Sequence, residues 1–311
     1  MNNRGIVRPA GESELRAALA IVFRHHSEEE RQTRVGNALR LLRQREIDPA
    51  GVLIAPDENR LLGAMVCVPV PGAGAMIWPP QALATTDAEK IEDQLLAYAE
   101  QWLRGRGVKL AQALLLSREK HLARSLLRNG FRAITSLEYL KHDLQLSRAW
   151  QSGNSEIRFV TYAQCNREHF HQALLASYTN TLDCPEVNGV RTIEEIIEGH
   201  RAQGLFDSGR WWLALRGGEP AGVLLLTELP EWDGWDVSYL GVVPATRRNG
   251  IGTALARKAL FEAHTAGAAQ LTLALDVRNV PASQLYRSLG FTSFDKREVY
   301  LAIWQIRKDS N

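Results

Sequence analysis

The residues of this chain best suited to chemistry are two glycines set among basic and polar residues. The segment Arg247-Arg248-Asn249-Gly250-Ile251-Gly252-Thr253 holds two arginines and two glycines. Glycine has no Cβ, so a bulky ligand can approach the backbone at Gly250 and Gly252. Amides in the first turn of a helix lack intrahelical partners and carry partial positive charge. The segment is therefore predicted to bind a phosphate or pyrophosphate group.

A strand and a helix must flank this segment if its amides are to converge on a ligand. Residues 235–241 are β-rich and apolar, which predicts a buried strand, and residues 254–263 carry apolar side chains at helical spacing. The spacing does not fit a Walker A loop, which needs Gly-Lys-Ser/Thr. It does not fit a dinucleotide fingerprint either, because that fingerprint needs a third glycine where Leu255 stands.

The pattern Arg-x-x-Gly-x-Gly after a strand ending in Val-x-Pro resembles the acetyl-CoA signature of the GNAT superfamily of N-acetyltransferases. A second segment, residues 279–291, resembles that family's pattern Asn-x-x-Ala-x-x-x-Tyr-x-x-x-Gly-Phe at every key position. Asn279 and Tyr286 are two helical turns apart and so share a helix face. The resemblance covers residues from about 157 to 304.

This resemblance implies direct transfer of an acetyl group from acetyl-CoA to an amine, with both bound together. The backbone at Val242 and Val243 would pair with the pantetheine arm, and an N–H there could polarise the thioester carbonyl. Tyr286 would protonate the leaving thiolate or donate a hydrogen bond to it. The cofactor-binding residues implied are Val242, Val243, Arg247, Arg248, Asn249, Gly250, Ile251, Gly252, Thr253, Asn279 and Ser283.

The attacking amine must lose a proton, so the reaction needs a base. Glu228 is the preferred candidate because it follows the end of a strand, and strand ends open onto the cleft. Asp183 and His200, in the region that shapes the acceptor site in this family, remain alternatives. Asp236 and Tyr239 also remain, although three residues of regular strand would put them on opposite faces.

An internal repeat relates the two halves of the chain. Residues 107–116 parallel 267–276, and residues 123–131 parallel 283–291. The offset is constant, since 267 − 107 = 160 and 290 − 130 = 160. The predicted fold is therefore α/β, with two tandem GNAT-like domains, each a mixed central sheet flanked by helices. This doubled layout is similar to that of the mycothiol synthase family.

The first copy is predicted to have lost the chemistry. At the same offset, the positions of the arginine, the two glycines, the asparagine and the tyrosine are taken by Asp87, Lys90, Glu92, Glu119 and Leu126. Acidic side chains would repel a pyrophosphate held against this backbone. The expected organisation is a diverged domain at 1–146 that does not bind CoA, a polar linker at 147–155 and a catalytic domain at 156–311.

Composition limits the classes of partner and the compartment that we expect for this chain. The net charge of +2 argues against a nucleic-acid partner, and no apolar run is long enough to span a bilayer. The three scattered cysteines and the absence of a signal-like N-terminus predict a cytoplasmic protein. The pair His25-His26 is interpreted as surface, and no metal site is predicted.

Two functions are compatible with these features. The first is an N-acetyltransferase acting on a small-molecule or peptide amine, and the second is a non-catalytic acyl-CoA sensor. Asn279 and Tyr286 favour the enzyme, because binding alone would not require them. The sequence defines neither the acceptor nor an oligomeric state.

Overall fold

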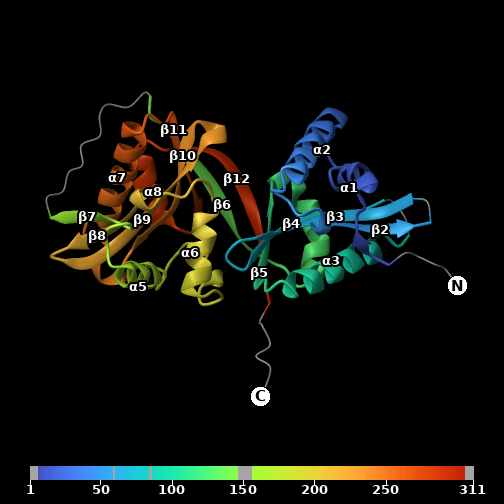
Figure 1. Ribbon diagram of the computed structural model, residues 1–311, viewed down its shortest axis with the longest axis horizontal. Coiled ribbons are helices and arrows are strands. Elements are labelled where there is room, and N and C mark those ends of the chain that lie inside the picture. Colours follow the sequence, from blue (N-terminus) through green and yellow to red (C-terminus); the bar gives the residue numbers. More distant parts are fainter. Residues whose placement is uncertain (1–5, 59, 84–85, 146–155, 305–311) are drawn as a thin grey trace, which may run out of the picture. The chain divides into compact units, whose positions relative to one another are not determined.

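The computed structural model describes residues 6–58, 60–83, 86–145 and 156–304 (Figure 1). The chain divides by its internal contacts into two compact units. The first unit comprises residues 1–134 and 298–311, and the second comprises residues 135–297. The linker expected at 147–155 lies outside the described residues.

The two copies have the same order of helices and strands. The first copy runs β1 (Arg8–Pro9), α1 (Leu15–Val22), α2 (Glu28–Arg43), β2 (Val52–Asp57), β3 (Arg60–Val70), β4 (Gly74–Ala82), α3 (Ala88–Arg104), β5 (Leu110–Leu115), α4 (Ala123–Arg128) and β6 (Arg132–Asp143). The second runs β7 (Ile157–Thr161), α5 (Arg167–Ser177), α6 (Ile193–Arg201), β8 (Trp211–Arg216), β9 (Glu219–Leu229), β10 (Gly234–Val242), α7 (Ile251–Thr265), β11 (Gln270–Asp276), α8 (Val280–Ser288) and β12 (Thr292–Ile303). The internal repeat is therefore confirmed.

The last strand of each copy is exchanged. Residues Glu298–Ile303 of β12 pair antiparallel with β5 in the first unit, which contains β1 to β5 in order. In the second unit, β6 pairs antiparallel with β11, and the order continues β11-β10-β9-β8-β7. The predicted boundaries thus follow the order of the two copies along the chain. The compact units differ from these copies because most of β6 belongs to the second unit and the end of β12 to the first. Because the copies resemble each other, sequence alone does not say which of two similar edges a last strand joins.

The second unit is layered around its sheet. Figure 1 shows α7 and α8 on one face of strands β7–β10 and α5 and α6 on the other. The adjacent Trp211 and Trp212 are 0% and 4% exposed and belong to two different hydrophobic clusters. Successive strand residues point to opposite faces, so this pair anchors both layers. The predicted class, α/β with mixed sheets flanked by helices, is confirmed.

Helix starts follow the expected capping chemistry. The Asn166 side chain accepts a hydrogen bond from the Glu168 N–H at the start of α5, and Thr192 and Glu195 form a capping box at α6. Within the described ranges, no helix is both long and apolar enough to cross a bilayer.

Candidate active site

The site lies where two parallel strands part. β10 and β11 pair only at Gly234–Asp236 with Gln270–Thr272. Further along, β10 remains paired with β9, with a register shift between Val237 and Tyr239. A cavity of about 330 Å³ opens in the gap, lined by residues 237–242 of β10 and 273–275 of β11. The loop after α5, the glycine segment and α8 complete its wall.

The glycine segment presents free amides as predicted. Gly250 has φ +76° and precedes α7, and the first intrahelical bond runs from the Ala254 N–H to the Gly250 carbonyl. The N–H groups of the first turn, at Ile251, Gly252 and Thr253, therefore have no partner within the helix. No side chain among the described residues caps this end. The end is thus suited to an anion.

Gly252 keeps this end open toward the cavity. A Cβ at Gly252 would lie 3.5 Å from Leu285 Cδ2 and 3.7 Å from Val242 Cγ2, which are ordinary contact distances. All three residues line the cavity. The fold would therefore accept a methyl group here, but that group would take space that a ligand could use.

Arg247 has a different role from the one predicted. Its guanidinium donates to four backbone carbonyls, at 3.1 Å to Val242, 3.0 Å to Ser177, 2.7 Å to Thr179 and 3.1 Å to Asn180. These bonds tie the end of α5 and the loop after it to the glycine segment. Arg247 is therefore a positioning residue. Arg248, exposed and at the cavity wall with φ +67°, remains the available guanidinium.

The backbone groups of Val242 and Val243 point in opposite directions. The Val243 N–H donates to the Ala221 carbonyl at 3.0 Å and is therefore used within the unit. Because the direction of backbone groups alternates along a strand, the Val242 N–H points away from β9 toward the gap. The expectation that both residues offer backbone groups to the pantetheine arm is corrected to Val242 alone.

Tyr286 and Asn279 both reach the cavity. Tyr286 is 6% exposed, and burial raises the pKa of its hydroxyl, reinforced by the carboxylates of Asp183 and Asp236. The Asn279 side chain caps α8 by accepting from the Ala282 N–H at 3.3 Å. Asn279 thus combines a structural role with its place in the cavity wall.

Glu228 does not belong to the cavity. It lies opposite Trp235, at the end of the gap where β10 and β11 are still paired, and it bonds to Arg210 at 2.6 Å. The reasoning from strand ends was wrong here, because β9 runs antiparallel to β10 and so ends at the closed end of the gap. Four other predicted residues, Asn249, Ile251, Thr253 and Ser283, lie on the flanking helices or turn rather than among the side chains that line the cavity.

Asp183 is the carboxyl that the cavity wall contains. Its Oδ1 accepts from the Asp276 N–H at 2.9 Å, and the Cys184 N–H donates to Asp276 Oδ2 at 3.1 Å. Burial and the nearby Asp276 carboxylate raise the pKa of Asp183, although the Asp276 N–H and Arg278 act against them. A carboxyl so placed can accept a proton near neutral pH more readily than an exposed one.

An ion pair with a fully buried carboxylate holds the loop after α5 in place, and the sequence analysis missed it. Asp276 is 0% exposed and bonds to Arg278 at 2.6 Å, while Arg278 also pairs with Glu186 at 2.6 Å. Thr135 donates to Asp276 at 2.6 Å. The available signal was an aspartate at a strand end directly before the Asn279 motif.

The bulge in β10 changes which residues share a face. Tyr239 lies opposite Leu225 and Asp236 opposite Thr227. Leu225 and Thr227 are two apart on β9 and share a face, so Tyr239 and Asp236 do as well. The expectation of opposite faces assumed a regular strand. The Tyr239 hydroxyl lies 2.8 Å from Ser177 Oγ. His200 Nε2 lies 3.2 Å from the Tyr178 hydroxyl, and burial lowers the pKa of the His200 imidazole to about 4.

The corresponding helix end in the first unit has a different environment. The acidic residues Glu89, Glu92 and Asp93 form ion pairs with Arg128, at 3.6, 3.2 and 3.1 Å. Leu126, at the position of Tyr286, is fully buried. That this copy does not bind CoA stays a prediction.

Comparisons with known proteins agree with the geometry. Residues 170–291 match the model of the acetyltransferase (GNAT) family. None of the curated proteins matches the chain.

Solved structures share the fold over the whole chain. A GCN5-related N-acetyltransferase from Sphaerobacter thermophilus is 14% identical with a TM-score of 0.62, over 96% of this chain and 95% of that one. A tandem GNAT protein from the clavulanic acid biosynthesis pathway is 16% identical with a TM-score of 0.50, over 97% and 99%. Residues 170–291 therefore match the GNAT acetyltransferase family by its model and by the two signature segments, and the solved structures share the fold.

Proposed function

We propose that the second unit is an acetyl-CoA-dependent N-acetyltransferase that acts by direct attack of an amine on the thioester. The amides of the first turn of α7 and the Arg248 guanidinium would hold the diphosphate of the cofactor. The Val242 N–H would bond to the pantetheine arm or to the thioester oxygen. Gly252 would leave the room that the cofactor backbone needs.

The remaining groups fit the transfer itself. The amine nitrogen attacks the thioester carbon, the C–S bond breaks, and the proton lost by the amine passes to Asp183. Asp183 replaces Glu228 as the proposed base because it lines the cavity. The pKa of Tyr286 is raised by burial, and a phenol is already less acidic than a thiol. Tyr286 is therefore assigned as a hydrogen-bond donor to the leaving thiolate, with the thiol taking its proton from water or the acid form of the base.

One observation carries this proposal. A single cavity is lined both by the uncapped glycine turn and by Tyr286, so a carrier held at one end would present its reactive end at the other. An ordinary glycine turn would not require such a continuous cavity.

The test is thiol release from acetyl-CoA in the presence of a panel of amines. Tyr286→Phe is expected to lower kcat by about 100-fold while leaving CoA affinity unchanged. Tyr300→Phe is the matched control, because Tyr300 is equally buried at 6% exposure but lies in the core of the first unit. Tight CoA binding without turnover for any amine would favour the acyl-CoA sensor instead. Equal rates in both variants would remove Tyr286 from the chemistry.

A further inference from the structure

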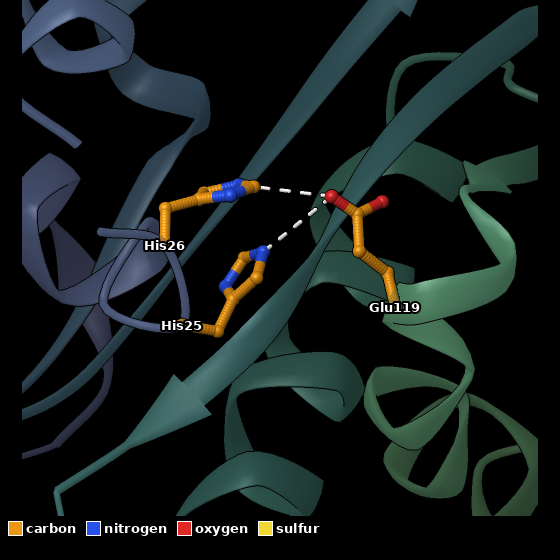
Figure 2. Close-up of side chains that lie close together, drawn as sticks. All are labelled: His25, His26 and Glu119. Atoms are coloured by element: carbon orange, nitrogen blue, oxygen red, sulfur yellow. Dashed lines mark ion pairs between the residues drawn. The ribbon is translucent and has the colours of Figure 1, made fainter. Parts of the chain in front are cut away.

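Three ligand-type side chains converge in the first unit, whereas the proposed catalytic cavity belongs to the second. His25 and His26 lie in the turn between α1 and α2, and Glu119 lies in the short 3-10 helix Ser117–Leu122 before α4 (Figure 2). Their metal-ligating atoms all lie within 4.8 Å of one another. The His25 and His26 side chains are only 13% and 4% exposed. The expectation of a surface pair was therefore wrong.

The Nε2 atoms of both imidazoles lie near the same carboxylate oxygen. His25 Nε2 and His26 Nε2 each lie 3.7 Å from Glu119 Oε1, as the dashed lines in Figure 2 mark. This separation is too long for a hydrogen bond. It is close to the separation of about 3.3 Å between two ligands of a tetrahedral zinc ion with bonds of about 2.0–2.1 Å.

The surrounding groups hold two of the three side chains in ligand geometry. The second nitrogen of His26, Nδ1, lies 3.3 Å from Glu30 Oε2, which fixes the ring with Nε2 directed at Glu119. The second oxygen of Glu119 accepts from the Leu116 N–H at 2.9 Å. Glu30 is itself held by Arg34 at 2.9 Å. Carboxylate–histidine support of this kind is typical of metal centres.

His25 lacks the hydrogen-bonded support that His26 and Glu119 have. Its buried Nδ1 has no hydrogen-bond partner among them, and its ring centroid lies 3.9 Å from that of His26. Two closely packed imidazoles beside one carboxylate gain little from each other as neutral groups. A shared cation would account for their convergence.

The geometry points to a zinc site in the first unit, formed by His25 Nε2, His26 Nε2 and Glu119 Oε1. A set of two imidazole nitrogens and one carboxylate oxygen, with a fourth coordination position open, suits Zn²⁺. Glu119 stands at the position that Asn279 occupies in the second copy. The ion would join the turn after α1 to the segment before α4, and so would stabilise the first unit.

Zinc titration of the full-length chain, first stripped of metal with a chelator, tests this inference. We expect one tight Zn²⁺ per chain and a higher melting temperature of the zinc-loaded protein. Co²⁺ at the same site should give the visible absorption of a four-coordinate ion. Glu119→Gln should weaken zinc binding at least 100-fold. Glu30→Gln, which removes a carboxylate that supports His26 but is not itself a proposed ligand, should weaken it about 10- to 100-fold.

His169→Ala is the matched control, because His169 is an exposed histidine of α5 in the second unit. It should bind zinc like the natural chain. If Glu119→Gln fails to fold because Leu116 loses its acceptor, Glu30→Gln and His26→Gln carry the test. Absence of stoichiometric zinc in the natural chain, or a zinc affinity of Glu119→Gln and Glu30→Gln equal to that of the natural chain, would overturn the site.

Discussion

Gly252→Ala should separate the stability of the second unit from its affinity for CoA. The added Cβ meets Leu285 and Val242 at 3.5 and 3.7 Å, so nothing has to move. Replacing glycine by alanine within a helix favours folding by roughly 0.5–1 kcal/mol. The same methyl group lies at the cavity wall, where it would prevent close approach of a diphosphate to the amides of α7. Loss of one charge-assisted hydrogen bond costs about 1.5–3 kcal/mol, which corresponds to about a 10- to 150-fold weaker Kd.

The assay is calorimetric titration with CoA, combined with thermal unfolding. Gly252→Ala should bind CoA at least about 10-fold more weakly and melt at the same temperature or a few degrees higher. Gly36→Ala is the matched control, since Gly36 is an exposed residue inside α2 with nothing within 4 Å of its added Cβ. It should gain stability without changing CoA affinity. If Gly252→Ala binds CoA as tightly as the natural chain, the diphosphate does not lie against this turn.

Three further predictions concern charged groups of the second unit. Asp183→Asn should lower kcat/KM by about 100-fold. The natural chain should lose activity as pH falls through the raised pKa of Asp183, and the variant should not show this decline. If the variant keeps the decline, Asp183 is not the base. Burial raises the pKa of Asp236 to about 6 against a hydrogen bond from Thr272, so the folded state holds this proton more tightly than the unfolded state does. Stability should therefore fall as pH rises from about 4 to about 6, and Asp236→Asn should gain up to about 3 kcal/mol at pH 7. Urea unfolding at both pH values measures this, and an Asn variant with unchanged pH dependence would contradict it. Arg247→Lys keeps the charge but cannot bond to four carbonyls, so hydrogen exchange in residues 178–190 should accelerate; unchanged protection would show that other contacts hold the loop.

The sequence predicted those features that depend on local pattern. The glycine turn before α7 and the repeat that relates the two copies follow from spacing and residue type, and the structure places them as expected. Strand alternation also explains why the buried Trp211 and Trp212 belong to different hydrophobic clusters.

Features that depend on long-range pairing were not predictable in this way. The positive charge of Arg247 predicts a phosphate ligand, whereas three of its four acceptors are carbonyls 67 to 70 residues earlier in the chain. Glu228 lies outside the cavity because the end at which β10 and β11 separate depends on the pairing of the whole sheet, which local sequence does not reveal. The bulge at Val237 carries no residue signature in this sequence, so the shared face of Asp236 and Tyr239 could not be foreseen.

The exchange of β6 and β12 has a consequence for how this chain can be divided. A fragment ending near residue 146 would retain β6 without its partner β11, and would leave β5 with an open edge where β12 belongs. Open edges of this kind recruit other chains and promote aggregation. Expressed separately, either half should aggregate, whereas the two halves produced together should complement each other. Cleavage at the junction would then leave an assembled protein, because each half supplies the edge that the other lacks.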